Sequence, residues 1–168
     1  MSETLDIALR AALIGIGATL VLDLWSLFLK TAFHLPFPNY VMVGRWIGGI
    51  PSGRLMSEDV AKEPAIGGER VIGWTAHYAI GVLFATLLVA IVGADWLSAP
   101  TLPPALMIGV VTVVAPLFVM QPAMGSGIAS SKSPNPNLAR ARSMLAHTAF
   151  GIGLYLAAAL IARLPFGG

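Results

Sequence analysis

Residues 71–92 read VIGWTAHYAIGVLFATLLVAIV, a run without a single charged side chain. A helix needs about 20 mainly apolar residues to cross the hydrocarbon core of a bilayer, and this run is long enough. Three more apolar stretches of this kind occupy residues 11–33, 104–120 and 143–162. Hydrophobic residues make up 57% of the chain and charged residues 11%, which is far from the composition of soluble domains. We therefore predict an all-α polytopic membrane protein whose four transmembrane helices form a single integral membrane domain over residues 1–168.

The basic residues predict how the chain is oriented in the membrane. Eight of its ten lysines and arginines lie in or beside two long loops, at about residues 35–69 and 121–139. Only Arg10 and Arg163 lie on the opposite side. The positive-inside rule then places both loops in the cytoplasm and both termini on the outer side. The bases are too dispersed to form a nucleic-acid-binding stripe, so we expect no nucleic acid as a partner.

Two of the spans carry nearly the same short sequence around a histidine. The first is AHYAIG at residues 76–81, and the second is AHTAFG at residues 146–151. The first and third spans share a weaker pattern at a constant offset, in which Pro116 takes the place of Asp23. These matches predict two helical hairpins in tandem that enter the membrane in the same orientation. Such parallel repeats are related by an axis along the membrane normal, and their interface is a common place for binding sites.

Three ionisable side chains are expected at one depth inside the membrane. From the helical rise of about 1.5 Å per residue, Asp23, His77 and His147 all fall on the order of 10–15 Å below the cytoplasmic boundary. Ionisable groups within transmembrane segments are costly and usually functional. We predict a substrate or proton site from these three residues together with Gln121, at the cytoplasmic end of the third span. The structural alternative is that the histidines only bond neighbouring helices, and that Asp23 is a neutral acid bonded to Thr19 or a histidine.

Three classes of function fit this pattern. The leading one is a small-solute or proton-linked transporter, in which Asp23 holds a proton and the histidines bind solute or relay protons, since histidine titrates near physiological pH. The second is a redox protein that binds haem b, with His77 and His147 as axial ligands, or a quinone. The third is a structural or assembly subunit of a membrane complex.

Other chemistries have less support in the sequence. The chain has no cysteine and no nucleophile elbow. We therefore predict no catalytic residue and favour a function other than catalysis. A metal site of two histidines and one carboxylate would lack the usual short ligand spacing, and we expect none. The expected partners include the lipid bilayer. Because four helices enclose little volume, we also expect a homo-oligomer or a membrane partner subunit.

Four short sequences carry a resemblance to a known family. They are GRWIG at residues 44–48, GWTAHYA at 73–79, MQPAMG at 120–125 and AHTAFG at 146–151. Together they resemble an uncharacterised family of four-span bacterial inner-membrane proteins, catalogued as a domain of unknown function. The resemblance covers essentially the whole chain. It implies a four-span topology and the bacterial inner membrane as the location, and it brings no substrate, cofactor or catalytic residue.

Overall fold

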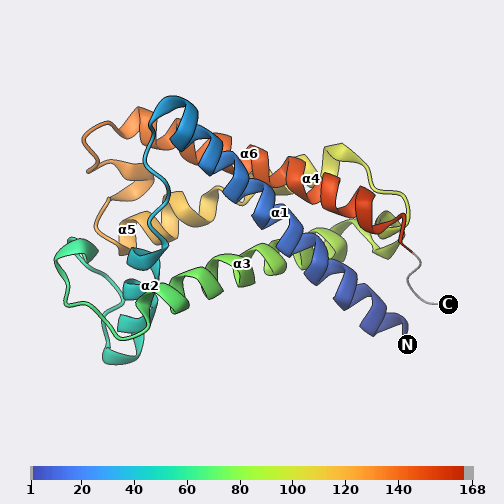
Figure 1. The fold of residues 1–168 in the computed structure, drawn as a ribbon. Coiled ribbons are helices and arrows are strands. Elements are labelled where there is room, and N and C mark those ends of the chain that lie inside the picture. The colour runs from blue at the N-terminus through green and yellow to red at the C-terminus, as the bar shows by residue number, and fades with distance from the viewer. Residues whose placement is uncertain (1, 165–168) are drawn as a thin grey trace.

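The computed structural model describes residues 2–164, which contain helices and loops and no β-strand. Four helical segments are long and apolar enough to cross a membrane (Figure 1): α1 (Glu3–Phe33), α3 (Glu69–Val92), the segment Leu102–Ala123 and α6 (Pro136–Ile161). The prediction of an all-α protein with four membrane-spanning helices is therefore confirmed. The shorter elements are α2 (Tyr40–Gly49), α4 (Leu102–Val111), α5 (Gln121–Ala123) and the turns η1 (Ile50–Ser52), η2 (Val60–Lys62), η3 (Ala94–Leu97), η4 (Pro116–Met120) and η5 (Ile128–Ser130).

Two of the spanning helices begin earlier than their apolar stretches. Helix α1 starts at Glu3, after Ser2, whose hydroxyl accepts a hydrogen bond from the Leu5 amide at 3.4 Å. Helix α6 starts at Pro136, after Asn135, whose side chain caps the first turn. Ser and Asn are favoured N-cap residues, and proline suits the first turn because its missing N–H is not needed there. The apolar stretch thus marks the part in the membrane, whereas the caps mark the ends of the helix.

The third span is not one regular helix. Helix α4 ends at Val111, the chain turns through Thr112 and Val113, and η4 is a π-helical turn that contains Pro116. Proline cannot donate the backbone hydrogen bond that a regular helix needs, which accounts for the break. Single π-helical turns inside helices often lie at functional sites.

Helix α1 lies at the centre of the packing, where it contacts both α3 and α6. Helix α4 packs on α6, and α2 packs along the N-terminal half of α3. Each predicted hairpin, α1 with α3 and α4 with α6, therefore has its own interface. Contacts between α3 and α4 are sparse, so the bundle is open on that side. Both long loops lie at one end, which we call the loop end, and α1 begins and α6 finishes at the other (Figure 1).

Glycines allow several of these helix pairs to approach closely. A Cβ atom on Gly109 would lie 2.5 Å from the Cα of Gly151, where α4 meets α6. A Cβ on Gly44 would lie 1.8 Å from the carbonyl oxygen of Glu69, where α2 meets α3. Small residues at helix interfaces are typical of membrane bundles, because lipid gives no hydrophobic force between helices and close packing must hold them.

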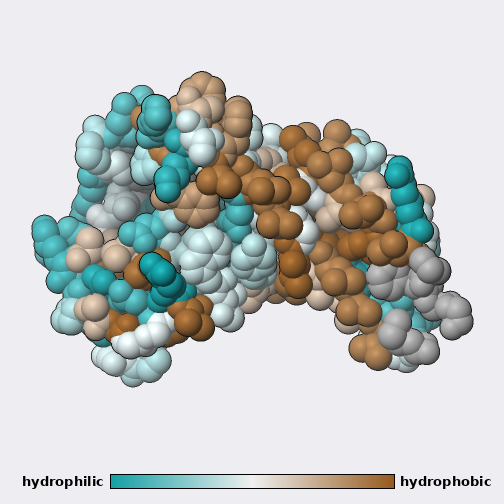
Figure 2. All heavy atoms as spheres, viewed as in Figure 1, coloured by the Kyte–Doolittle hydropathy of each residue, from teal (hydrophilic) through white to brown (hydrophobic). Residues whose placement is uncertain are grey.

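The outer surface is apolar in its middle part. Figure 2 shows brown, hydrophobic residues over the spanning helices and teal, hydrophilic residues at the loop end. Large side chains at helical spacing along α1, such as Leu13, Leu20 and Leu24, are at least one-third exposed. An exposed surface of this kind is suited to lipid, which agrees with a membrane-embedded protein. The buried core is built from smaller residues with few large ones, and Ile14, Leu88, Leu154 and Thr19 are its largest fully buried side chains.

Candidate functional site

Asp23 and His77 are directly bonded, so the structure brings two of the predicted site residues together. The imidazole Nε2 of His77 lies 3.0 Å from one carboxylate oxygen of Asp23. The phenol of Tyr78 donates to the other carboxylate oxygen, also at 3.0 Å. The side chains of His77 and Asp23 are only 10% and 12% exposed. A carboxylate, an imidazole and a phenol thus form one connected, nearly buried hydrogen-bonded group. We call Asp23 and His77 the acid–histidine pair, and Tyr78 donates a hydrogen bond to it.

Aromatic rings enclose His77 on the loop side. The ring of Tyr40 stacks on the imidazole with centroids 3.9 Å apart and planes 22° apart, and Trp74 meets it edge-on at 5.9 Å. Tyr40 reaches this position because it is the first residue of α2, and its carbonyl oxygen lies against Gly73 of α3. Burial and the Asp23 carboxylate raise the pKa of the Tyr40 phenol, so this group stays protonated.

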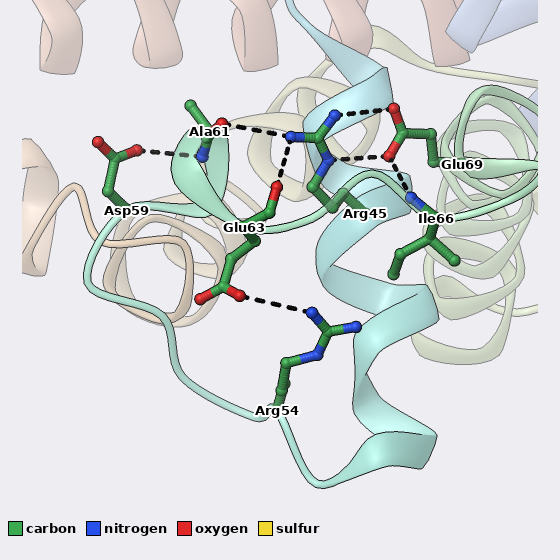
Figure 3. Close-up of polar contacts among 7 residues, drawn as sticks. All are labelled: Arg45, Arg54, Asp59, Ala61, Glu63, Ile66 and Glu69. Carbon is green, nitrogen blue, oxygen red and sulfur yellow. Dashed lines mark hydrogen bonds and ion pairs between the residues drawn. The ribbon is translucent and has the colours of Figure 1, made fainter.

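Helix α2 is fixed in place by a second polar group in loop one (Figure 3). The guanidinium of Arg45 donates to both carboxylate oxygens of Glu69, at 2.8 and 2.9 Å, and also to the carbonyl oxygens of Ala61 and Glu63. Bidentate pairs of this kind fix orientation as well as adding energy. The contact joins α2 to the start of α3, so it also holds Tyr40 over His77.

His147 makes a different set of contacts from His77. Its Nδ1 lies 3.0 Å from the Thr112 hydroxyl and 3.2 Å from the Gly109 carbonyl oxygen. The carbonyl can only accept, and the Thr112 hydroxyl already donates to the same oxygen at 2.7 Å, so Nδ1 carries the proton. Nε2 is then left as an acceptor. A histidine fixed through an Nδ1–H to a carbonyl is a common way of orienting a binding nitrogen.

Both histidines line one cavity, which we call the cleft. It has a volume of about 550 Å³, and its wall is almost entirely apolar. Leu83 of α3 and Val119 of η4 line it while each is more than half exposed, so the cleft opens sideways between these two elements. The residues that line it are Thr19, Leu22, Pro38, Tyr40, Val43, Trp46, Ile47, His77, Ile80, Gly81, Leu83, Phe84, Ala115, Pro116, Val119, Met120, Ser143, Ala146, His147 and Phe150.

Gln121 lies apart from this layer, at the loop end. It accepts a hydrogen bond from Ser130 at 2.7 Å and approaches Ser143 at 3.4 Å. It lines a second, smaller cavity of about 270 Å³, which we call the polar pocket. The residues that line the polar pocket are Trp25, Ser26, Leu29, Pro36, Pro38, Gln121, Ala139, Arg142, Ser143 and Ala146.

Several residues of the site were not singled out in the sequence. Tyr78 directly follows His77 in the chain. The sequence does not show that the side chains of both residues bond to the carboxylate of Asp23. Tyr40 lies in the first of the two predicted long loops, yet its ring packs on His77. Thr112 lies within the third apolar stretch, where nothing in the sequence marks it as a partner of His147. Within residues 2–164 no group of three or more His, Cys, Asp or Glu side chains could hold a metal ion.

The comparison with known families decides the membership of this chain. The profile of DUF2938, described as a protein of unknown function, matches residues 12–161. The chain belongs to this family. The match covers most of the first span, the other three spans and both loops, in agreement with the resemblance seen in the sequence. Comparisons with curated proteins and with solved structures give no significant match.

Proposed function

We propose that this protein is a proton-linked carrier that binds a small apolar or amphiphilic solute in the cleft. The observation that carries the proposal is the acid–histidine pair at the wall of an apolar cavity that opens toward lipid. Ionisable groups placed in this way mark substrate and proton pathways in membrane proteins. His77 and Asp23 can exchange a proton between them, and the stacked Tyr40 limits their access to water.

The broken third span supports movement as well as binding. Pro116 and Met120 of η4 line the cleft, and helix breaks at membrane depth are tolerated where they border a cavity. Because α3 and α4 have few contacts, η4 can move away from α3 with little loss of packing. A change of that kind would alter which side of the cleft is open.

The proposal predicts that solute binding depends on pH through Asp23 and His77. The probe is N-phenyl-1-naphthylamine, which fluoresces in apolar sites and does not ionise between pH 5 and 9, so a pH effect on binding belongs to the protein. We expect the affinity of the wild type to change across this range, by up to tenfold per pH unit if one proton is linked to binding. In the variants Asp23→Asn and His77→Gln, the affinity for the probe should change little across this pH range.

His34 provides the matched control. It is exposed at the end of α1 with a left-handed backbone (φ 54°), which asparagine also adopts readily. His34→Asn should therefore keep the wild-type pH profile. A flat profile in the wild type, or a wild-type profile in Asp23→Asn, would contradict the proposal.

One observation supports haem as a second candidate function. His147 lines the cleft, and within residues 2–164 its Nε2 makes no hydrogen bond, as an axial ligand requires. His77 instead directs its Nε2 to Asp23, so the geometry favours the carrier. The visible spectrum of protein purified from haem-replete cells tests this, since a Soret band that is lost in His147→Ala would establish haem. The third class, an assembly subunit, has less support because Tyr40, Val43, Trp46 and Ile47 of α2 line the cleft of their own chain.

We propose further that the protein lies in the bacterial inner membrane, as a homo-oligomer or with a membrane partner subunit, and that its loop end is in the cytoplasm. The distribution of basic residues supports this orientation. The chain contains no cysteine, so single cysteines can report on each end. Ser52→Cys in loop one and Ser98→Cys in the turn after α3 are both at exposed positions. A membrane-impermeant thiol reagent added to intact spheroplasts should label the second and spare the first, and the reverse pattern would overturn this orientation.

A further inference from the structure

The cleft and the polar pocket adjoin each other. Pro38, Ser143 and Ala146 line both cavities, so these residues form the boundary at which one continues into the other. The polar pocket lies between the last turns of α1 and the first turns of α6, at the loop end. From there the cleft extends deeper into the bundle, as far as Phe84 and Phe150. A small polar cavity at the membrane boundary thus leads into a larger apolar one at membrane depth.

The polar pocket carries an uncompensated positive charge. Arg142 is partly buried, and its only hydrogen bond within residues 2–164 is to the carbonyl oxygen of Pro36. All eight acidic residues lie within the described part, and the five ion pairs found there do not include Arg142. Partly buried Arg142 therefore has no carboxylate partner within residues 2–164.

Further hydrogen-bond donors line the same pocket. The indole ring of Trp25 also lines the pocket, although its Nε1 is buried. Ser26, Gln121 and Ser143 add hydroxyl and amide groups. A cation with several donors matches an anionic group with several oxygen atoms.

We propose that the cleft binds a membrane lipid with an anionic headgroup, taken from the leaflet at the loop end. The headgroup lies in the polar pocket against Arg142, and the acyl chain lies in the cleft. The lipid enters sideways between α3 and η4, where the cleft is open. This inference names the solute of the proposed carrier and so rests on the proposed function. The charge of the pocket argues for an anionic lipid and against a zwitterionic one.

The experiment compares two lipids that differ only in their headgroup. Phosphatidylglycerol and phosphatidylcholine, each with the same NBD-labelled acyl chain, are titrated into purified protein in a neutral detergent. Both headgroups carry a phosphate that can accept a hydrogen bond from Arg142, but phosphatidylcholine also brings a cationic choline next to the guanidinium. We therefore expect the wild type to prefer phosphatidylglycerol by about tenfold. Arg142→Gln should bind both lipids equally, and Arg142→Lys should keep most of the preference. Arg140→Gln is the matched control, because Arg140 lies on the same helix but is exposed and does not line either cavity.

Three outcomes would overturn the assignment. Equal binding of the two lipids by the wild type would remove the headgroup site. Loss of the preference in Arg140→Gln as well would indicate general surface attraction to anionic lipid. Displacement of the labelled lipid by millimolar inorganic phosphate would indicate a phosphate site without a lipid.

A second assay separates this inference from the proposed function. In proteoliposomes with NBD-labelled phosphatidylglycerol in both leaflets, dithionite bleaches only the lipid that reaches the outer leaflet. Lipid selectivity with no protein-dependent transfer between leaflets would leave the lipid site standing and reject a carrier. Binding of N-phenyl-1-naphthylamine that depends on pH through Asp23, with no lipid preference, would keep the carrier and reject the lipid. Transfer that is lost in Arg142→Gln and kept in Arg140→Gln would support both.

Discussion

The substitution Gly73→Ala should displace α2 and uncover the acid–histidine pair. A Cβ at this position would lie 1.8 Å from the carbonyl oxygen of Tyr40, whereas ordinary van der Waals contact begins at 3.4 Å. The obstacle is backbone, which cannot rotate away as the end of a side chain can. Helix α2 must therefore move from α3 by roughly 1.5 Å, since neither helix can compress. Because Tyr40 is the first residue of α2, its ring would then lose its stacking on His77.

The expected loss of stability follows from the packing. Adding one methyl group to a well-packed interface costs about 1–3 kcal/mol, and contact with backbone places this case near 3 kcal/mol. For a chain of this size that corresponds to a fall of roughly 6–12 °C in Tm. The movement should also admit water to His77, so the pH dependence of N-phenyl-1-naphthylamine binding should change together with Tm.

The assay is thermal unfolding in detergent, followed by tryptophan fluorescence, with the probe titration on the same samples. Gly67→Ala is the matched control, because no atom lies within 4 Å of a Cβ at that position. Its Tm should stay close to that of the wild type. An unchanged Tm in Gly73→Ala would refute the close approach of α2 to α3. An equal loss in both variants would show that the cost does not arise from the contact with the Tyr40 carbonyl oxygen.

Two further predictions concern the polar contacts. Arg45→Lys should lower Tm more than Arg54→Lys, because lysine cannot reproduce the bidentate pair with Glu69, whereas Arg54 makes one long contact of 3.4 Å from a partly exposed position; equal shifts in thermal scans would contradict this. His147 should be an Nδ1–H tautomer at neutral pH, and Thr112→Val should leave it so because the Gly109 carbonyl remains. Nitrogen-15 spectra of histidine-labelled protein, with His147→Gln to assign the signal, measure this, and an Nε2–H signal would refute the assignment.

Sequence patterns located the polar residues but not their partners. Asp23, His77 and His147 stand out because ionisable groups are rare in apolar runs, and their shared depth follows from helical rise alone. Pairing depends on how the helices are rotated about their axes and on which helices are neighbours. The local sequence does not show that Asp23 pairs with His77. It also does not show that His147 bonds to Thr112, which lies one helical turn before Pro116, the position that matches Asp23. Gln121 was grouped with the other three, yet it lies in the polar pocket.

The role of loop one also depended on tertiary structure. The run from Tyr40 to Ile47 is amphipathic, and such a pattern suits a helix that lies on the membrane surface as well as one that packs on another helix. Gly44 and Gly73 decide between the two, because together they let α2 lie directly on α3. This contact places Tyr40 on His77, a consequence that becomes visible only when two segments separated by a loop are brought together.

The number of spans, the all-helical class and the presence of polar groups within the spans can all be predicted from the amino-acid sequence. These follow from the length and composition of each segment, because a bilayer requires every span to be apolar and to satisfy its own backbone hydrogen bonds. Only the three-dimensional arrangement of the helices shows that α3 and α4 have few contacts, that a cleft opens on this side of the bundle, and that the polar pocket adjoins the cleft. These features arise from the crossing and packing of helices, and packing is set by contacts between residues far apart in the chain.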